Sequence, residues 1–361
     1  MNTPTPAAEA PLPETPQKRG KKKYFISAGI LAGFLLLFYL LQLLLMPKYM
    51  TETREGAMIA EYYDSPKDHS VVFVGDCEVY ESYSPVALWR EYGISSYIRG
   101  SAQQLIWQSY YLMEDTLRYE TPDVFVFNIQ SVQYGEPQRE EYNRMTLDGM
   151  RLSSTKLAAI KASMLEDESI ASYLFPILRY HERITSLSVE DFRYLFSRDP
   201  VTYNGYLLNT GVDPFTTAEF QRPLADYTLS PTCIEYLDKM VALCEAHGVQ
   251  LIFVKAPSIA VTWYPQWEAQ VVAYAQEKGI PYYNFLECTD EVGLDFSTDT
   301  YDRGNHLNLS GAEKLTHYFG QILRSEFSLP DEREDKTKQR FWETVGKAYD
   351  EEIAKSRRED G

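Results

Sequence analysis

The sequence predicts an α/β fold, a three-layer sandwich with a central parallel sheet, that carries an N-terminal transmembrane helix and a helical insertion. Short apolar runs, typical of strands buried on both faces, alternate with helical patterns. An uncharged stretch lies near the N-terminus, and the segment from about 131 to 232 is rich in Tyr and Arg without a repeated strand signal. These three observations define the architecture that we expect.

The N-terminal residues 1–23 are expected to form a disordered, basic cytoplasmic tail. Residues 1–17 contain five prolines and no large hydrophobic cluster, and residues 18–23 are mostly Lys and Arg. Residues 24–46 follow without a charge and would extend about 35 Å as a helix, enough to cross a hydrocarbon core of about 30 Å. Pro47 ends this span. Under the positive-inside rule the N-terminus stays in the cytoplasm, so we expect a single-pass protein of the cell membrane with its main domain extracytoplasmic.

A cleaved signal peptide is the alternative interpretation of this segment. Its apolar region would usually have about 7–15 residues, followed by a small-x-small cleavage site. Residues 43–46, Leu-Leu-Leu-Met, offer no such site. The sequence therefore favours a retained anchor.

Beyond the anchor, four apolar runs are predicted strands, at residues 71–74, 124–127, 249–254 and 280–285. Helical patterns separate them at residues 103–120, 234–247 and 267–278. Gly248 and Gly279 directly follow the last two patterns, which is typical of helix C-termini. Strands that alternate with helices predict a parallel sheet covered by helices on both faces.

The extracytoplasmic domain is expected to cover residues 47–328. The insertion at about 131–232 is mostly helical in pattern, and we interpret it as a cap over the site. Residues 329–361 form a highly charged C-terminal extension with an amphipathic stretch around Trp342 and Tyr349 that could pack back on the domain.

The charge of the chain excludes one class of partner. The sequence has 35 basic and 52 acidic residues, a net charge of −17. Residues 1–50 hold six basic and two acidic residues, so they carry +4 and the remaining 311 carry −21. A domain with this charge should repel nucleic acid.

The cysteines do not indicate a disulfide framework or a zinc site. Cys77, Cys233, Cys244 and Cys288 are few, widely scattered and without CxxC spacing. Cys233 and Cys244 lie eleven residues apart on a predicted helix, about 16 Å along its axis, which rules out a bond between them. We expect them in the core, and we expect no metal and no cofactor.

Candidate site residues stand where predicted strands end, the edge of a parallel sheet at which reactive groups gather. Cys77 follows the first strand in the turn Gly-Asp-Cys-Glu, where backbone N–H groups and a helix dipole would favour an anionic nucleophile. Gly100 allows a backbone N–H to approach a ligand closely. Asn128 has an amide that can donate to an oxyanion. Asp302 and His306 supply a carboxylate and a base close together in the sequence.

In this order the residues resemble the SGNH/GDSL hydrolase superfamily, whose fold is a flavodoxin-like three-layer sandwich. That family places a nucleophile in a Gly-Asp-Ser turn after the first strand, donors at a glycine and an asparagine, and Asp-x-x-His near the C-terminus. The resemblance covers about residues 68–325 of this chain. With the N-terminal anchor, the chain is most similar to the membrane-anchored branch that accompanies membrane-bound O-acyltransferases, including the teichoic-acid D-alanylation and alginate O-acetylation proteins.

The chain departs from that pattern at three positions. Cys77 stands where the family has serine, and Glu78 where many anchored relatives have histidine. Asp302 lies four residues before His306 instead of the usual three. Asp76 and Glu78 would raise the pKa of the Cys77 thiol, whereas the dipole of the turn would lower it.

The resemblance implies an acyl-ester enzyme, an O-acyltransferase or an esterase acting on a cell-envelope polysaccharide or polymer. Cys77 would attack an acyl carbonyl, His306 would carry the proton, and Asp302 would orient the imidazole. Gly100, Asn128 and the Cys77 backbone would hold the oxyanion. A multi-pass membrane-bound O-acyltransferase would be the donor partner and a cell-envelope glycan the acceptor.

Two alternatives remain open at this stage. The first is a catalytically degenerate SGNH domain that binds a glycan or docks the acyltransferase without turnover. The second is plain ester hydrolysis. Each site residue also has a structural interpretation: Cys77 as a small buried side chain, His306 as a capping or surface histidine, and Asp302, Gly100 and Asn128 as turn or strand-end residues. Trp263 and Trp267 are weak candidates for stacking on a sugar, or for packing beneath a loop.

Overall fold

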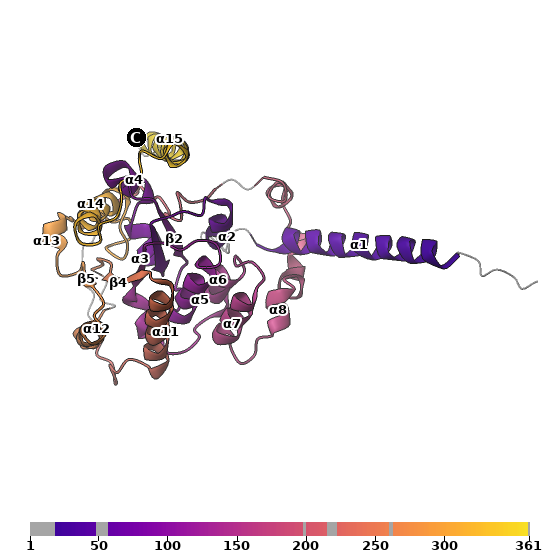
Figure 1. The fold of residues 1–361 in the computed structure, drawn as a ribbon, viewed down its shortest axis with the longest axis horizontal. Helices are drawn as coiled ribbons and strands as arrows, with labels where there is room; N and C mark the ends of the chain where they lie inside the picture. Colours follow the sequence, from indigo (N-terminus) through magenta and orange to yellow (C-terminus); the bar gives the residue numbers. More distant parts are fainter. Residues whose placement is uncertain (1–18, 48–56, 198–199, 215–221, 260–262, 360–361) are drawn as a thin grey trace, which may run out of the picture.

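The computed structural model describes residues 19–47, 57–197, 200–214, 222–259 and 263–359. A single parallel sheet of five strands, in the order β2-β1-β3-β4-β5, organises them (Figure 1). The strands are β1 Val71–Gly75, β2 Ser96–Gly100, β3 Val124–Asn128, β4 Gln250–Lys255 and β5 Tyr282–Asn284. The predicted α/β fold with a central parallel sheet is therefore confirmed.

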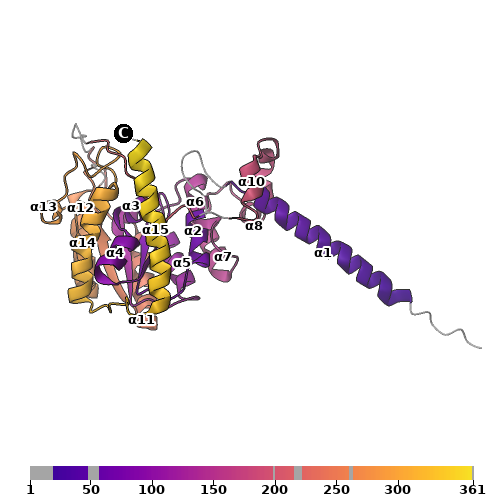
Figure 2. The ribbon, with the colours of Figure 1, turned by 90° about the horizontal axis from the view of Figure 1, so that it is seen from above.

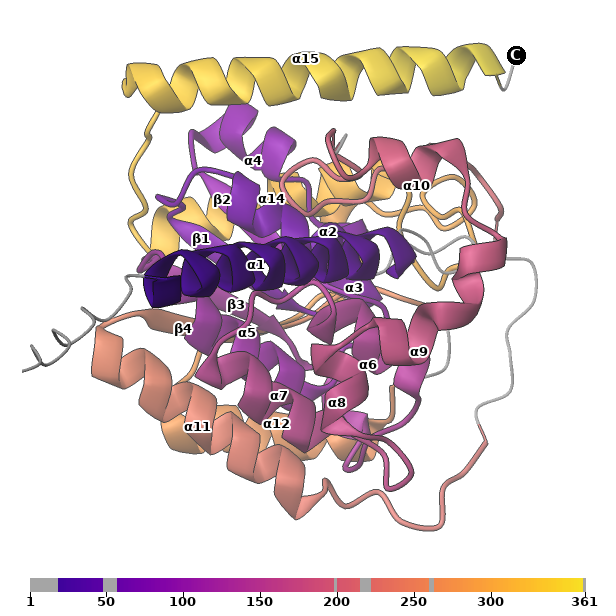
Figure 3. The ribbon, with the colours of Figure 1, turned by 90° about the vertical axis from the view of Figure 1, so that its right-hand side faces the viewer.

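Helices cover both faces of the sheet, because alternate strand residues bury their side chains on opposite sides. One core gathers the side chains of Val72, Phe125 and Phe253 under α5 Ile106–Thr116, α7 Ser154–Ser163, α11 Pro231–His247 and α12 Pro265–Lys278. The other gathers Phe73 and Val126 under α3 Cys77–Ser82, α4 Pro85–Tyr92 and α14 Leu309–Glu326. Figure 3 shows the two helical layers above and below the strands.

The two helices with predicted glycine ends form as expected. Gly248 and Gly279 have φ of 67° and 69°, the left-handed conformation that ends α11 and α12. Both helices begin earlier than the apolar pattern indicated, at Pro231 and Pro265, because proline is well suited to the first turn. Cys233 and Cys244 of α11 are buried in the core, as expected.

The insertion contains short helices up to Arg193, as its pattern predicted, whereas its described residues 200–214 and 222–230 hold no helix. The short helices are α6 Glu140–Leu147, α7, α8 Ile170–Leu174, α9 Ile177–Tyr180, the 3-10 turn η3 His181–Thr185 and α10 Val189–Arg193. Helix α7 packs against α5, and α9, η3 and α10 contact the N-terminal helix. These contacts extend the helical layer beside the sheet, and the segment around residues 209–213, described below, contacts the loop of the predicted site.

The N-terminal helix α1, Arg19–Leu45, leaves the domain as a long rod (Figures 1 and 2). Its residues Lys23–Leu45 are long and apolar enough to cross a membrane. Two short elements, α2 Ala57–Glu61 and η1 Tyr62–Asp64, precede β1, and α13 Thr289–Val292 lies between β5 and α14.

The C-terminal extension packs back on the domain as α15, Lys336–Glu359. The Trp342 ring stacks on Trp89 of α4 at 5.4 Å between centroids and 12° between planes. Tyr349 is buried, and its hydroxyl lies 3.3 Å from the hydroxyl of Ser84 and donates to Glu313 at 3.1 Å. Charged side chains of α15 also contact the domain, since Asp350 pairs with Arg90 of α4 at 2.8 Å, so the extension is an integral outer helix.

Candidate active site

The turn after β1 is shaped by Gly75, which has a φ of +152°. A Cβ at this position would lie 2.5 Å from a methyl of Val79 and 3.0 Å from Cβ of Asn128. Asp76 then caps α3, its side chain accepting from the N–H of Glu78 at 3.3 Å. Cys77 is consequently the first residue of α3, half-buried at the carboxyl edge of the sheet.

His306 is held by Asp302 through two hydrogen bonds. Its Nδ1–H donates to Oδ2 of Asp302 at 2.6 Å, and its backbone N–H donates to Oδ1 at 2.8 Å. Arg303 and Gly304 between them adopt left-handed conformations, φ +62° and +86°, which accommodates the extra residue in the loop. The four-residue spacing thus brings the carboxylate onto the imidazole.

Cys77 and His306, far apart in the sequence, lie close enough in the site for each to shift the pKa of the other. Burial would lower the pKa of His306, but the Cys77 thiolate, Glu81 and Asp302 outweigh it and raise this pKa to about 12. Burial raises the pKa of the Cys77 thiol, with His306 acting in the opposite direction. The Cys77 thiolate and the His306 imidazolium therefore stabilise each other.

Glu81 is a second carboxylate on the same imidazole. Its Oε2 lies 3.3 Å from Nδ1 of His306 and accepts from the Tyr301 hydroxyl at 2.8 Å. The Tyr301 ring stacks on the His306 ring at 6.1 Å. Burial raises the pKa of Glu81 to about 7, against the lowering effect of His306 and Tyr301. The charge around the histidine therefore changes near neutral pH.

A buried ionic network contacts the turn that carries Cys77. The ammonium of Lys255, at the end of β4, lies 2.8 Å from both carboxylate oxygens of Glu78 and donates to the carbonyl of Ala256. Both charged side chains are almost fully buried. Burial and the Glu78 charge raise the pKa of Asp76 to about 7, although Lys255 and Asn128 lower it. Lys255 thus balances part of the negative charge beside Cys77.

Asn128 belongs to this network in the structure. Its amide donates to Asp76 at 3.1 Å and to Glu78 at 3.0 Å, while its carbonyl accepts the N–H of Ala256 at 3.0 Å. Both amide hydrogens are therefore directed at carboxylates, and the predicted oxyanion donor holds the turn in place.

Gly100 lies directly beside the turn, because β2 pairs with β1 in the register Gly75↔Gly100. A Cβ on Gly100 would be 3.0 Å from the Tyr80 ring and 3.3 Å from the carbonyl oxygen of Gly75. The absence of a side chain allows α3 to approach the strand. The structure thus brings Cys77, His306, Asp302, Gly100 and Asn128 to one edge of the sheet.

Trp263 and Trp267, the weak candidates for sugar binding, differ from these residues because they make packing contacts. Trp263 donates its indole N–H to Glu268 at 2.7 Å, and the Lys255 ammonium lies 6.0 Å from its ring centroid. Trp267 is 8% exposed and part of the core against Tyr264 and Trp263. Trp267 therefore presents no free ring face to a ligand, and its location agrees with the packing alternative.

Part of the insertion touches the loop that carries the histidine. Asp213 donates its backbone N–H to Thr300 and accepts from the backbone N–H of Arg303. Asn308 donates its amide to the carbonyl of Gly211 at 2.9 Å. The segment around 209–213 therefore braces the 300–309 loop.

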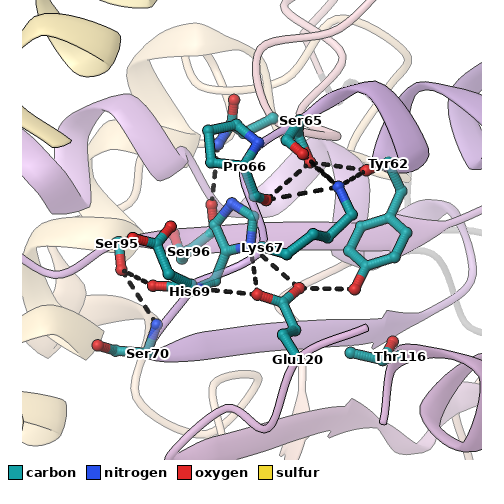
Figure 4. Close-up of polar contacts among 12 residues, drawn as sticks. Tyr62, Ser65, Pro66, Lys67, His69, Ser70, Ser95, Ser96, Thr116 and Glu120 are labelled. Atoms are coloured by element: carbon teal, nitrogen blue, oxygen red, sulfur yellow. Dashed lines mark hydrogen bonds and ion pairs between the residues drawn. The ribbon is translucent and has the colours of Figure 1, made fainter. Parts of the chain in front are cut away.

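A second histidine–carboxylate pair lies at the opposite edge of the sheet (Figure 4). His69 Nδ1 is 3.0 Å from a Glu120 oxygen, and the Tyr62 hydroxyl donates to the other at 2.6 Å. Burial would raise the pKa of Glu120, but these hydrogen bonds and the His69 charge lower it. His69 and Glu120 are buried at the amino end of β1, away from the carboxyl ends of the strands, and we interpret this pair as structural.

Three site residues were not found from the sequence: Glu81, Tyr301 and Lys255. Glu81 lies four residues after Cys77, so a short helix there places both on one face, and this spacing was the available signal. Lys255 is a charge that ends an apolar strand, which indicates a buried partner. Tyr301 had no comparable signal. Among the described residues, no group of three or more His, Cys, Asp or Glu side chains could hold a metal ion.

Comparisons with known proteins give structural likeness only. No protein-family model and no curated protein sequence matches the chain. A GDSL-like lipase from Bacteroides thetaiotaomicron is 14% identical, with 75% of this chain and 100% of that chain covered, at a TM-score of 0.35. The family 3 carbohydrate esterase of Clostridium thermocellum is 12% identical, with 72% and 98% covered, also at 0.35. Such distant likeness carries no conclusion about activity, which has to come from the geometry of the site.

Proposed function

We propose that this protein is a membrane-anchored, extracytoplasmic acyl-ester enzyme that uses Cys77 as its nucleophile. The observation that supports this function best is the Asp302–His306–Cys77 series at the carboxyl edge of β1, with 2.6 Å between Asp302 and the imidazole. A nucleophile, a proton carrier and an orienting carboxylate in this order form the general arrangement of acyl-transfer sites.

The proposed reaction has two steps. The Cys77 thiolate attacks the carbonyl carbon of an acyl ester, and a C–S bond forms. The C–O bond of the ester then breaks, and His306 gives its proton to the departing alkoxide. In the second step a hydroxyl or water attacks the thioester, His306 takes its proton, and the thiolate of Cys77 is released. Asp302 keeps the imidazole in position throughout.

The oxyanion would be held by backbone donors in this proposal. The N–H of Cys77, at the start of α3, and that of Gly100 on the neighbouring strand are the candidates, since both lie next to the nucleophile. Asn128 would contribute only if its amide left Asp76 or Glu78 on substrate binding. As the structure stands, its contribution is to hold the turn.

We further propose that the acceptor is a hydroxyl of a cell-envelope polysaccharide or polymer, which makes the enzyme an O-acyltransferase. The resemblance to the anchored teichoic-acid D-alanylation and alginate O-acetylation proteins supports this choice, together with the apolar span of α1. A multi-pass membrane-bound O-acyltransferase would then supply the acyl group. Simple ester hydrolysis uses the same residues with water as acceptor.

A degenerate binding domain is the second candidate function, and one observation favours it. Burial raises the pKa of the Cys77 thiol, so little thiolate is present at neutral pH before a substrate arrives. Such a domain would bind a glycan or dock the acyltransferase without turnover.

One experiment separates the three functions. The full chain in detergent micelles is incubated with an activated acyl ester and an envelope glycan. Formation of acylated glycan supports the transferase if Cys77→Ala abolishes it and His306→Ala lowers its rate at least about 100-fold. Hydrolysis with no acylated glycan at any acceptor concentration indicates an esterase. Glycan binding without acyl chemistry, unchanged by both variants, leaves only the binding domain.

The membrane topology is tested separately. We expect protease added to intact cells to digest the domain that follows Pro47 and to leave the N-terminal tail protected, because of the basic cluster at residues 18–23. A protected domain with a cleaved tail would reverse the orientation, and a mature N-terminus beyond Met46 would show that the span is removed.

A further inference from the structure

The domain overlaps the apolar span of α1 instead of starting where the span ends. Lys23–Leu40 is exposed except for the half-buried Phe38, whereas residues 41 to 47 are half-buried apart from the buried Leu45. The Phe38 ring lies 6.2 Å from the ring of Phe175, and Phe38 is about 10 Å along the helix from Leu45. The domain therefore reaches about 10 Å back along the span.

This overlap leaves only part of α1 free of the domain. The part before the Phe38–Phe175 contact, Lys23–Leu37, has a length of about 22 Å, against a hydrocarbon core of about 30 Å. If α1 spans the membrane, as in the proposed function on which this inference depends, the missing thickness coincides with the part of α1 covered by the domain. The elements that cover it must then lie at the depth of the lipid.

Those elements carry the exposed apolar side chains that such a depth requires. Outside α1, nine large hydrophobic residues of the described chain are exposed, and six of them fall between residues 175 and 196. Their exposed fractions run from 45% to 90%. We refer to them as the 175–196 patch: Phe175, Leu178, Ile184, Val189, Phe192 and Phe196.

The segment that carries the patch is fixed to the end of α1 and to the domain by polar contacts. Arg183 donates to the carbonyl of Leu45 at 2.8 Å and to Asp191 at 2.9 Å. Arg179 donates to Glu140 at 2.8 Å, and the Tyr180 hydroxyl donates to Asp148 at 2.9 Å. Figures 1 and 2 show α8 and α10 beside the domain end of α1. The apolar side chains are therefore presented by a braced structure.

The charge of this segment also suits a lipid surface. Residues 170–197 contain three Arg and three acidic residues and are thus neutral, whereas the 311 residues after 50 carry −21. Negative charge would be repelled by anionic lipids, and this segment lacks the excess found elsewhere. Amphipathic helices with aromatic and aliphatic side chains on one face are typical of membrane interfaces.

We propose that α8, α9, η3 and α10 are embedded in the outer surface of the bilayer, with the 175–196 patch inserted among the acyl chains beside α1. The helix and the patch together fill one leaflet, and they hold the catalytic domain at a fixed height and orientation. In this proposal the patch contacts lipid. The test below distinguishes lipid from a protein partner at the same place.

The test uses the full chain in liposomes of phosphatidylcholine and phosphatidylglycerol without any other protein. In a Cys77→Ala, Cys288→Ala background, where Cys233 and Cys244 stay buried, single cysteines labelled with an environment-sensitive fluorophore replace Phe192 or Phe196. Val212→Cys is the matched control, an exposed apolar residue outside the patch. Leu35→Cys reports on α1. Quenching by lipids with a nitroxide in the upper acyl chain is measured for each.

We expect at least about twofold quenching of the labels at 192 and 196, and none at 212. Quenching at 35 without quenching at 192 and 196 overturns the proposal and leaves the anchor intact. A patch that serves a protein partner gives this same result in protein-free liposomes. Loss of quenching at 35 as well means that α1 is not inserted, and both the anchor and the embedded patch are then rejected. Equal unfolding midpoints in urea confirm that the labelled variants fold.

Discussion

Oδ2 of Asp302 lies 2.6 Å from Nδ1 of His306, although the two residues are separated by a loop one residue longer than the Asp-x-x-His pattern. The left-handed Arg303 and Gly304 absorb the additional residue. A short contact between ionic partners fixes the orientation of the ring and favours its protonated form.

Replacing Asp302 by Asn should lower ester hydrolysis strongly. The amide retains the shape of the side chain, but it cannot stabilise the imidazolium or fix its tautomer. We expect a loss of at least about 100-fold in kcat/KM for a nitrophenyl ester. Asp290→Asn, on the exposed helix α13, is the control and should have no effect. A loss under threefold for Asp302→Asn would assign the orienting role to Glu81.

Cys77 should lose reactivity when His306 is changed to Gln. The imidazolium counteracts the effect of burial on the pKa of the thiol, so its removal raises that pKa further. We expect iodoacetamide labelling of Cys77 at pH 8 to slow by about 10-fold. Cys288 in the same chain is the internal reference, since the charges that act on it are Glu287 and Glu291. Equal slowing at both cysteines would indicate a general structural change.

Stability should depend on pH through Glu81. Burial raises its pKa from 4.5 to about 7 in the folded chain. The folded state therefore holds a proton that the unfolded state has released, and the resulting stability is present below pH 4.5 and lost as the pH rises to 7. Between pH 5 and pH 8, wild type should lose about 2 kcal/mol of unfolding free energy relative to Glu81→Gln. Urea unfolding at both pH values measures this difference, and a constant gap would contradict the shifted pKa.

Lys255→Met should destabilise the protein by about 3–5 kcal/mol, because it leaves the buried carboxylate of Glu78 without its oppositely charged partner. The double variant Lys255→Met, Glu78→Gln removes both charges and should recover more than half of the loss. Urea unfolding of the two variants gives both values. If the double variant is as unstable as the single one, the packing of the lysine stem, and not the ion pair, accounts for the effect.

Much of the sheet could be predicted because its central strands are continuous apolar runs. The apolar residues 71–74 and 124–127 predict β1 and β3, and the glycines that follow α11 and α12 predict where these helices end. The edge strand β2 was visible only through Gly100, since Ser96 and the buried Arg99 interrupt its apolar character. Arg99 is compensated by Asp115 at 2.9 Å, a partner sixteen residues away that no local pattern reveals.

The site could be predicted less completely, for a related reason. The positions of Cys77 and His306 follow from turns after strands, which are local features. Whether Asn128 points at an oxyanion or at Asp76 depends on which carboxylates the fold brings beside it. The charge state of the cluster depends on Lys255, which reaches Glu78 across 177 positions of the sequence. Such contacts are set by tertiary packing alone.

The outer position of α15 has a consequence for the order in which the molecule can be assembled. The N–H of Ser84, just beyond the helix that begins with Cys77, donates to Thr316 across 232 positions, and its hydroxyl contacts Tyr349 across 265. The residue just beyond the helix of Cys77 is thus fixed by contacts to the last part of the chain to be synthesised. Closing such long loops is slow. The helix that begins with Cys77 therefore reaches its final position only after α14 and α15 have docked.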